Sequence, residues 1–86
     1  MNQSDKEQSI IFAEQWFEQI EYVENTFHRD YFRSWFGNLS PYFLRRPEDL
    51  TRMKSLLSKY ERTDKTFFVK LLKEEIDAVE DLIAMS

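Results

Sequence analysis

Hydrophobic side chains recur every three or four residues over most of the chain, which is the spacing of helices with one buried face. The first stripe begins after Ser4 and Glu7, whose spacing is that of a capping box, in which the serine caps the first helical turn. The pattern predicts a helix from about Asp5 to Asn25. The residues of its stripe are Ile10, Ala13, Phe17, Ile20 and Phe27, widened by Trp16 and Val23.

Two rows of aromatic side chains follow in the stretch HRDYFRSWFGNLSPYFLRR, from His28 to Arg46. Both rows have helical spacing. They predict a second helix that ends near Gly37 and Asn38, a pair suited to the left-handed backbone of a helix end. One row consists of Phe27, Tyr31, Trp35 and Leu39, and the adjacent row consists of Phe32 and Phe36.

Prolines mark the starts of the next two elements. Ser40 before Pro41 has the pattern of an N-cap followed by proline in the first turn, which predicts a short helical element. This element ends by Arg46, because the residue before Pro47 is pushed away from helical backbone geometry. The apolar residues that it carries are Tyr42, Phe43 and Leu44.

The rest of the chain is predicted to form two helices. Pro47 begins the first, and the two acids after it favour the positive end of the helix dipole. Thr63 and Asp64 can cap the second, which runs from about Lys65 to Ala84. The stripe of the first is Leu50, Met53, Leu56, Leu57 and Tyr60, and that of the second is Phe68, Leu72, Ile76, Val79 and Ile83.

These elements predict an all-α fold, a small four-helix bundle in which two long amphipathic helices frame shorter, aromatic-rich central helices. The whole chain, residues 1–86, is expected to be a single helical domain, with residues 1–4 frayed at its end. One glycine and two prolines are too few for a strand-rich fold, which needs many tight turns.

Composition narrows the class of protein. The chain has no cysteine, which excludes disulfides and thiolate chemistry and fits a reducing compartment. No apolar run reaches the length of about 18 to 20 residues that spans a bilayer, and the polar N-terminus is unlike a signal peptide. We therefore expect a cytoplasmic protein without a membrane span.

The net charge of −4 is unevenly distributed. Residues 1–28 carry a balance of −5, residues 29–73 a balance of +6, and residues 74–86 again a balance of −5. One interpretation is that two acidic ends pack beside a basic middle and partly neutralise it. The other is that a basic face stays open for an acidic partner.

Residues for catalysis or cofactor binding are not recognisable. His28 is the only histidine, and no nucleophile stands near it at a known motif spacing. Glu24 precedes it by four residues, which predicts a surface contact on a helix. The glutamate–histidine motif of di-metal bundles and the calcium-binding loop are absent, and Gly37 alone cannot build a phosphate-binding loop. We expect no enzymatic activity, no metal, no cofactor and no small-molecule substrate.

The surplus of aromatic rings favours protein binding, because a bundle this small cannot bury all of its 14 aromatic residues. We expect a non-enzymatic interaction module, a regulator, adaptor or inhibitor, whose partner is a larger host protein or a second copy in a homodimer. Among the central rings Phe32, Trp35 or Phe36 are assigned to the core. The predicted contact surface consists of Tyr31, Arg33, Tyr42, Phe43, Arg45 and Arg46.

Nucleic-acid binding through the basic middle of the chain is the alternative. It is weakened by the net negative charge and by the acidic residues of the last helix, which phosphate would repel. A membrane-surface helix is a further alternative, but Gly37, Pro41 and Pro47 interrupt the aromatic stretch too early. The residues that would contact nucleic acid are Arg45, Arg46, Arg52, Lys54 and Lys59.

Overall fold

The computed structural model describes residues 3–37 and 39–85, with side chains from residue 7 onward. This part of the chain contains helices and no strand, which confirms the predicted all-α bundle. The helices are α1 (Gln3–Ile20), α2 (Thr26–Phe36), α3 (Ser40–Phe43), α4 (Pro47–Tyr60) and α5 (Thr66–Met85).

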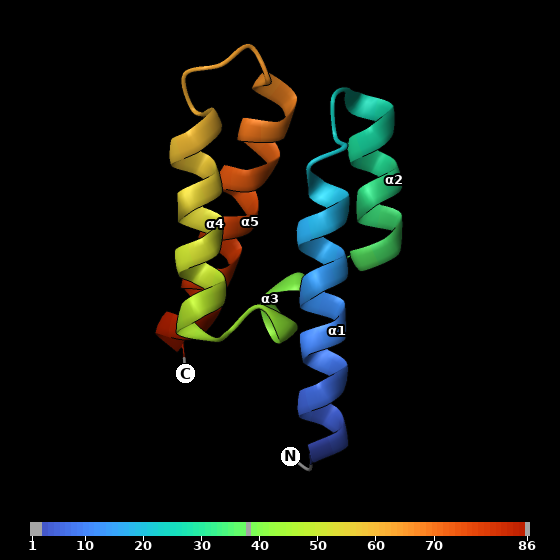
Figure 1. The fold of residues 1–86 in the computed structure, drawn as a ribbon, viewed down its shortest axis with the longest axis vertical. Helices are drawn as coiled ribbons and strands as arrows, with labels where there is room; N and C mark the ends of the chain where they lie inside the picture. Colours follow the sequence, from blue (N-terminus) through green and yellow to red (C-terminus); the bar gives the residue numbers. More distant parts are fainter. Residues whose placement is uncertain (1–2, 38, 86) are drawn as a thin grey trace.

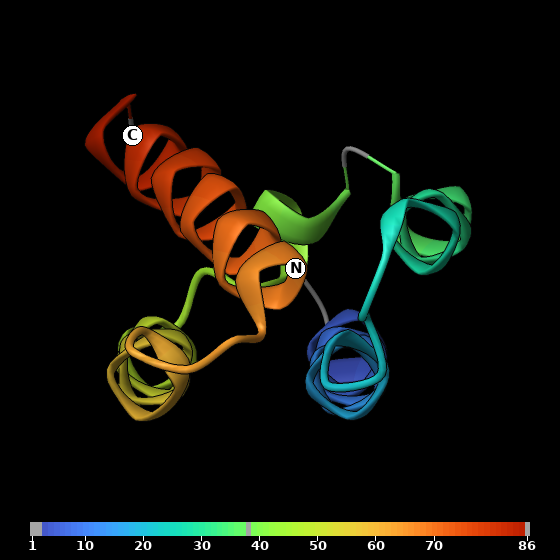
Figure 2. The same ribbon diagram turned by 90° about the horizontal axis from the view of Figure 1, so that it is seen from above.

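The fold consists of two antiparallel helix pairs joined by α3 (Figure 1). The first pair is α1 with α2, and the second is α4 with α5. Seen from above, α5 begins near the middle of the molecule and runs out to one edge, and α2 lies at the opposite edge (Figure 2). The short α3 packs against both α5 and α1, so it holds the two pairs together.

The first helix ends earlier than its hydrophobic pattern predicts. Helix α1 stops at Ile20 rather than near Asn25, because the N–H groups of Tyr22 and Val23 bond to carbonyls three residues back and tighten the chain into a turn. Asn25 instead caps α2, and its side-chain oxygen accepts from the His28 N–H at 2.9 Å. Ser4 already lies within α1, and its side chain lies outside the described part of the structure.

The end of α2 and the start of α3 follow the sequence closely. Gly37 has φ of 55° and donates its N–H to the Arg33 carbonyl, which confirms the predicted helix stop. Asn38 lies outside the described residues. The residue that caps α3 is Leu39, so Ser40 is not the N-cap; its buried hydroxyl has no hydrogen-bond partner among the described atoms.

The predictions for the last two helices hold within one or two residues. Helix α4 begins at Pro47, with Glu48 and Asp49 in its first turn. Before α5, the Thr63 hydroxyl oxygen accepts from the Lys65 N–H at 3.3 Å. Among the described helices, none is both long enough and apolar enough to cross a membrane.

The core lies where α5 meets the other helices. Of the two aromatic rows of α2, one faces this core and the other does not. Phe32 and Phe36 are buried, as predicted, and Trp16 packs edge-to-face on Phe32 with ring centroids 5.8 Å apart. Phe27 and Trp35 were each predicted to belong to the core, and this is wrong. The side chain of Phe27 is 75% exposed and that of Trp35 is 69% exposed, because this row lies beside the core and is not enclosed by a neighbouring helix.

Candidate functional site

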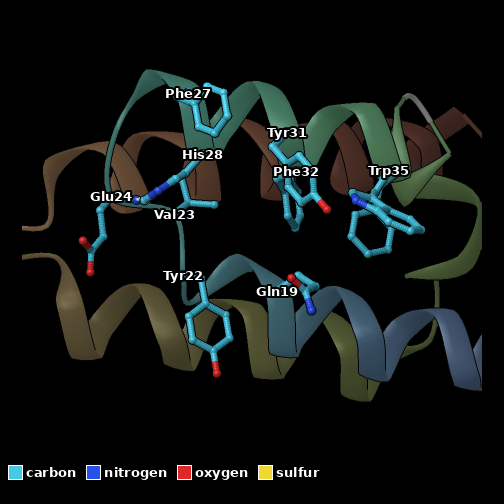
Figure 3. A pocket seen from close by; sticks show the side chains of 10 residues that line it. Gln19, Tyr22, Val23, Glu24, Phe27, His28, Tyr31, Phe32 and Trp35 are labelled. Carbon is cyan, nitrogen blue, oxygen red and sulfur yellow. Dashed lines mark hydrogen bonds between the residues drawn. The ribbon is translucent and has the colours of Figure 1, made fainter.

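An apolar groove lies between α2 and the C-terminal end of α1 (Figure 3). Its volume is about 510 Å³. A second depression of about 290 Å³ adjoins it and shares Gln19, Tyr31, Trp35 and Phe36 with it. We call the two together the α1–α2 groove. Its lining residues are Gln15, Glu18, Gln19, Tyr22, Val23, Glu24, Phe27, His28, Tyr31, Phe32, Trp35 and Phe36.

Buried residues form the floor of the groove. Val23, Phe32 and Phe36 are all buried in the core, and the Phe32 and Phe36 rings meet at a tilt of 44° with centroids 4.9 Å apart. Trp16 supports Phe32 from below, and its own indole N–H has no hydrogen-bond partner among the described atoms. The floor of the groove therefore belongs to the packed core.

Exposed rings form the walls. Tyr31 and Trp35 extend from α2 towards α1, with Gln19 reaching up from α1 opposite them (Figure 3). The two rings meet edge-to-face at 6.2 Å. Phe27 and Tyr22 also line the groove at its other end, and both are largely exposed; the Tyr22 ring points away from α2 (Figure 3). Single exposed rings are ordinary on protein surfaces, but several rings along one apolar groove are typical of a binding surface.

His28 lies at the end of the groove and is held by backbone contacts. Its Nδ1 accepts from the Glu24 N–H at 3.2 Å, and its own N–H donates to the Asn25 side chain. The predicted pairing of Glu24 and His28 along one helix is therefore wrong, because α1 has ended before Glu24. The contact is between backbone and imidazole.

The predicted contact surface does not form one patch. Tyr31 lies in the groove, whereas Arg33 turns to α5 and forms an ion pair with Glu74. Tyr42 is 64% exposed on α3, outside the groove. Phe43 is half-buried, with ring contacts to Phe12 at 5.8 Å and Phe36 at 6.0 Å. Of the two remaining predicted residues, Arg45 is exposed and Arg46 is half-buried.

Arg46 serves the fold. Its guanidinium donates two hydrogen bonds of 2.9 Å to Asp49, a residue that is itself buried in the first turn of α4. The hydrogen bond to Asp49 raises the pKa of Arg46 above its ordinary value. A buried carboxylate needs such a partner, so this pair fixes the connection between α3 and α4.

The acidic ends of the chain do pack beside its basic middle. Arg52 donates to Glu14 of α1 at 2.9 Å, and its guanidinium lies 4.1 Å from the centre of the Phe17 ring. Lys54 lies 3.6 Å from Glu80 of α5. Three of the five residues of the predicted nucleic-acid surface, Arg46, Arg52 and Lys54, are therefore in ion pairs. Lys59 lies over the Tyr60 ring at 5.2 Å.

A buried carboxyl lies beside the contact of α2 with α5. Glu75 is only 8% exposed, and burial raises its pKa to about 7. The positive charge of Arg33 opposes this shift, and the negative charge of Glu74 adds to it. Within the described residues, no three carboxylate or histidine side chains gather as a metal ion would require.

The comparisons with known proteins give no further guidance. No protein family, curated protein or solved structure matches this chain significantly. The function is therefore argued from the geometry of the site.

The sequence contained the pattern of the groove, but Phe27 and Trp35 were predicted to face the core, and only Tyr31 of this row was predicted to face a partner. The row of Phe27, Tyr31 and Trp35 is visible from its spacing of four, and so is the neighbouring row of Phe32 and Phe36. Spacing shows that the two rows lie on adjacent faces of one helix, but it does not show which face meets the core. Tyr22 had no periodic signal, because it follows the end of α1.

Proposed function

We propose that this protein is a non-enzymatic interaction module that binds a segment of a larger protein in the α1–α2 groove and so regulates, adapts or inhibits that protein. The observation that carries the proposal is the exposed aromatic row of Phe27, Tyr31 and Trp35 beside a buried floor. Large rings supply much of the free energy of protein association, since they bury a large apolar area with little loss of conformational freedom. The proposal includes a cytoplasmic location, with which the cysteine-free composition is compatible.

Nucleic-acid binding has less support from the contacts. Binding to phosphate depends on cations that are available to replace counterions. Arg46, Arg52 and Lys54 already face carboxylates of the same chain, and the groove rings lie on a different pair of helices.

Site-specific photo-crosslinking in the source cells tests the proposal. A photoreactive phenylalanine analogue replaces Trp35 in one variant and Tyr42 in another. The two positions are matched because both rings are largely exposed, and only Trp35 lines the groove. We expect a discrete protein adduct from position 35, lost when Phe27→Ala and Tyr31→Ala are added, and no such adduct from position 42.

The opposite pattern would overturn the proposal. An adduct from position 42 alone would move the contact surface to α3. An adduct at position 35 that survives the two alanine substitutions would show contact without recognition by the rings. Adducts that disappear on nuclease treatment would favour the nucleic-acid alternative.

A further inference from the structure

The charges that line the α1–α2 groove are all of one sign. The charged residues among the lining side chains are Glu18 and Glu24, and no lysine or arginine is among them. Glu24 lies at the end of the groove, with its carboxylate pointing away from the rings (Figure 3). Both glutamates are exposed, and neither has an ion-pair partner within the described part of the chain. An occupant with positive charge is therefore complementary to the groove.

The aromatic walls of the groove also favour an occupant with positive charge. The face of an aromatic ring attracts cations, and guanidinium groups both stack on rings and bond to carboxylates. Trp35 and Tyr31 present rings next to Glu18 in the second depression. One occupant arginine can thus stack on a ring and reach a carboxylate in the same place.

A second copy of the chain is a poor occupant on the same grounds. A two-fold pairing of two grooves would bring the glutamates of one copy towards those of the other, and like charges in an interface are costly. Docking of the basic helix α4 into the groove is also disfavoured, because Arg52 and Lys54 are already paired with Glu14 and Glu80.

The length of the groove defines the size of the occupant. Phe27 and Trp35 stand eight residues apart on α2, which corresponds to about 12 Å of helix axis. A helix of matching length presents side chains on one face over two turns, as helices bound in grooves do.

We propose that the occupant of the α1–α2 groove is a cationic amphipathic helix of another protein, an inference that rests on the function proposed above. Its apolar side chains pack against the exposed rings above the buried floor of Val23 and Phe32. Its arginines or lysines lie against the Tyr31 and Trp35 rings and near Glu18, and Glu24 adds negative charge at the other end of the groove.

Two designed peptides test this inference directly. Both carry leucines at helical spacing on one face; the basic peptide has arginines on its polar face, and the acidic peptide has glutamates at the same positions. Each labelled peptide is titrated with the protein and followed by fluorescence anisotropy. We expect the basic peptide to bind at least about tenfold more tightly, with affinity that falls as salt is raised.

Substitutions then locate the binding. Replacing Glu18 and Glu24 together by glutamine should lower the affinity for the basic peptide by about fivefold or more. It should also reduce the dependence of that affinity on salt. The matched control is Glu7→Gln with Asp81→Asn, which removes the same charge from exposed positions outside the groove. Trp35→Ala should weaken binding by about tenfold, and its control, Tyr42→Ala, should not change it.

Each contrary result has a defined meaning. Equal affinity for the two peptides, with Trp35→Ala weakening both, would overturn the cationic occupant and leave the proposed protein-binding groove in place. If the control pair weakens binding as much as the Glu18 and Glu24 pair does, the attraction depends on the net charge of the protein and not on the groove. That result would overturn the inference. Absence of peptide binding together with a position 35 adduct in cells would reject this chemistry while supporting the function.

Discussion

Single residues of α2 have opposite roles although they are neighbours in sequence. Phe32 is 3% exposed and supports the core, whereas Tyr31, one residue earlier, is 55% exposed and lines the groove. A helix turns by about 100° per residue, so adjacent residues point in different directions. The functional proposal therefore depends on which direction the core lies in.

Alanine substitution separates the two roles. Phe32→Ala should lower the free energy of unfolding by about 3 to 5 kcal/mol, because it leaves a cavity beneath the groove. Trp35→Ala should change it by about 0.5 kcal/mol or less, as for other exposed positions. Urea unfolding followed by circular dichroism measures both. If Phe32→Ala does not fold, Phe32→Leu gives a smaller loss in the same direction. A large loss from Trp35→Ala would contradict the exposed placement of that ring.

Glu75 makes stability depend on pH. Its pKa rises from 4.5 to about 7 in the folded protein, because burial disfavours the charged carboxylate. The folded state thus binds this proton more tightly than the unfolded chain. The contribution of the protonated Glu75 carboxyl to the stability of the fold is fully present below pH 4.5, and it is lost as the pH rises through 7.

Replacement of Glu75 by glutamine should remove this dependence. At pH 8 the Glu75→Gln protein should be more stable than the parent by about 1 to 3 kcal/mol, with little difference at pH 4.5. Asp81→Asn, an exposed change on the same helix, is the control. Thermal unfolding across this pH range checks the prediction, and equal stability of parent and variant at pH 8 would contradict it.

At the scale of elements, α2 depends on its two ends. It has 11 residues, too few for a helix to be stable alone in water. Asn25 caps its first turn, and Gly37 ends it with a positive φ that other residues rarely adopt. These local signals fix the length of the helix that carries the aromatic row.

Loss of the cap should therefore weaken α2. Asn25→Ala removes the oxygen that accepts from the His28 N–H, and it should destabilise the protein by about 1 kcal/mol. Asn25→Asp keeps an acceptor and should retain most of the stability. Chemical denaturation of the two variants beside the parent measures the difference. If both variants lose the same stability, the hydrogen bond to the His28 N–H is not the source of the stability that Asn25 provides.

At the scale of the molecule, α2 is the least supported of the longer helices. It lies at the edge of the molecule (Figure 2), where it packs against α1 and α5 and meets α3 through the contact of Phe36 with Phe43. Its row of Phe27, Tyr31 and Trp35 is largely exposed. By contrast, α5 contacts α2, α3 and α4 and supplies much of the core. Local opening requires less free energy where fewer apolar contacts are broken.

Hydrogen exchange should reveal this difference. Amides in the middle of α2 should exchange faster than those in the middle of α5, and the basic peptide should slow exchange in α2 most strongly. Exchange measured by NMR with and without peptide checks both statements. Identical protection in the two helices would show that the molecule opens only as one unit.

Local signals in the sequence were enough to place most helices. Pro47 at the start of α4 and Gly37 at the end of α2 act through their own backbone geometry, so no distant residue is needed to interpret them. The end of α1 was missed because its hydrophobic stripe continues past Ile20. Only the turn that leads into α2 shows where the helix stops.

The sequence by itself therefore determined the all-α fold, the helix order and the presence of two aromatic rows. Only the tertiary structure decided that Phe32 faces the core and Trp35 faces the groove, and that Arg46, Arg52 and Lys54 are held in ion pairs. The physical reason is that periodicity depends on neighbours within one helix. Burial and charge neutralisation depend on residues that are distant in sequence, such as Glu14 and Glu80, and that only the packing of the helices brings near.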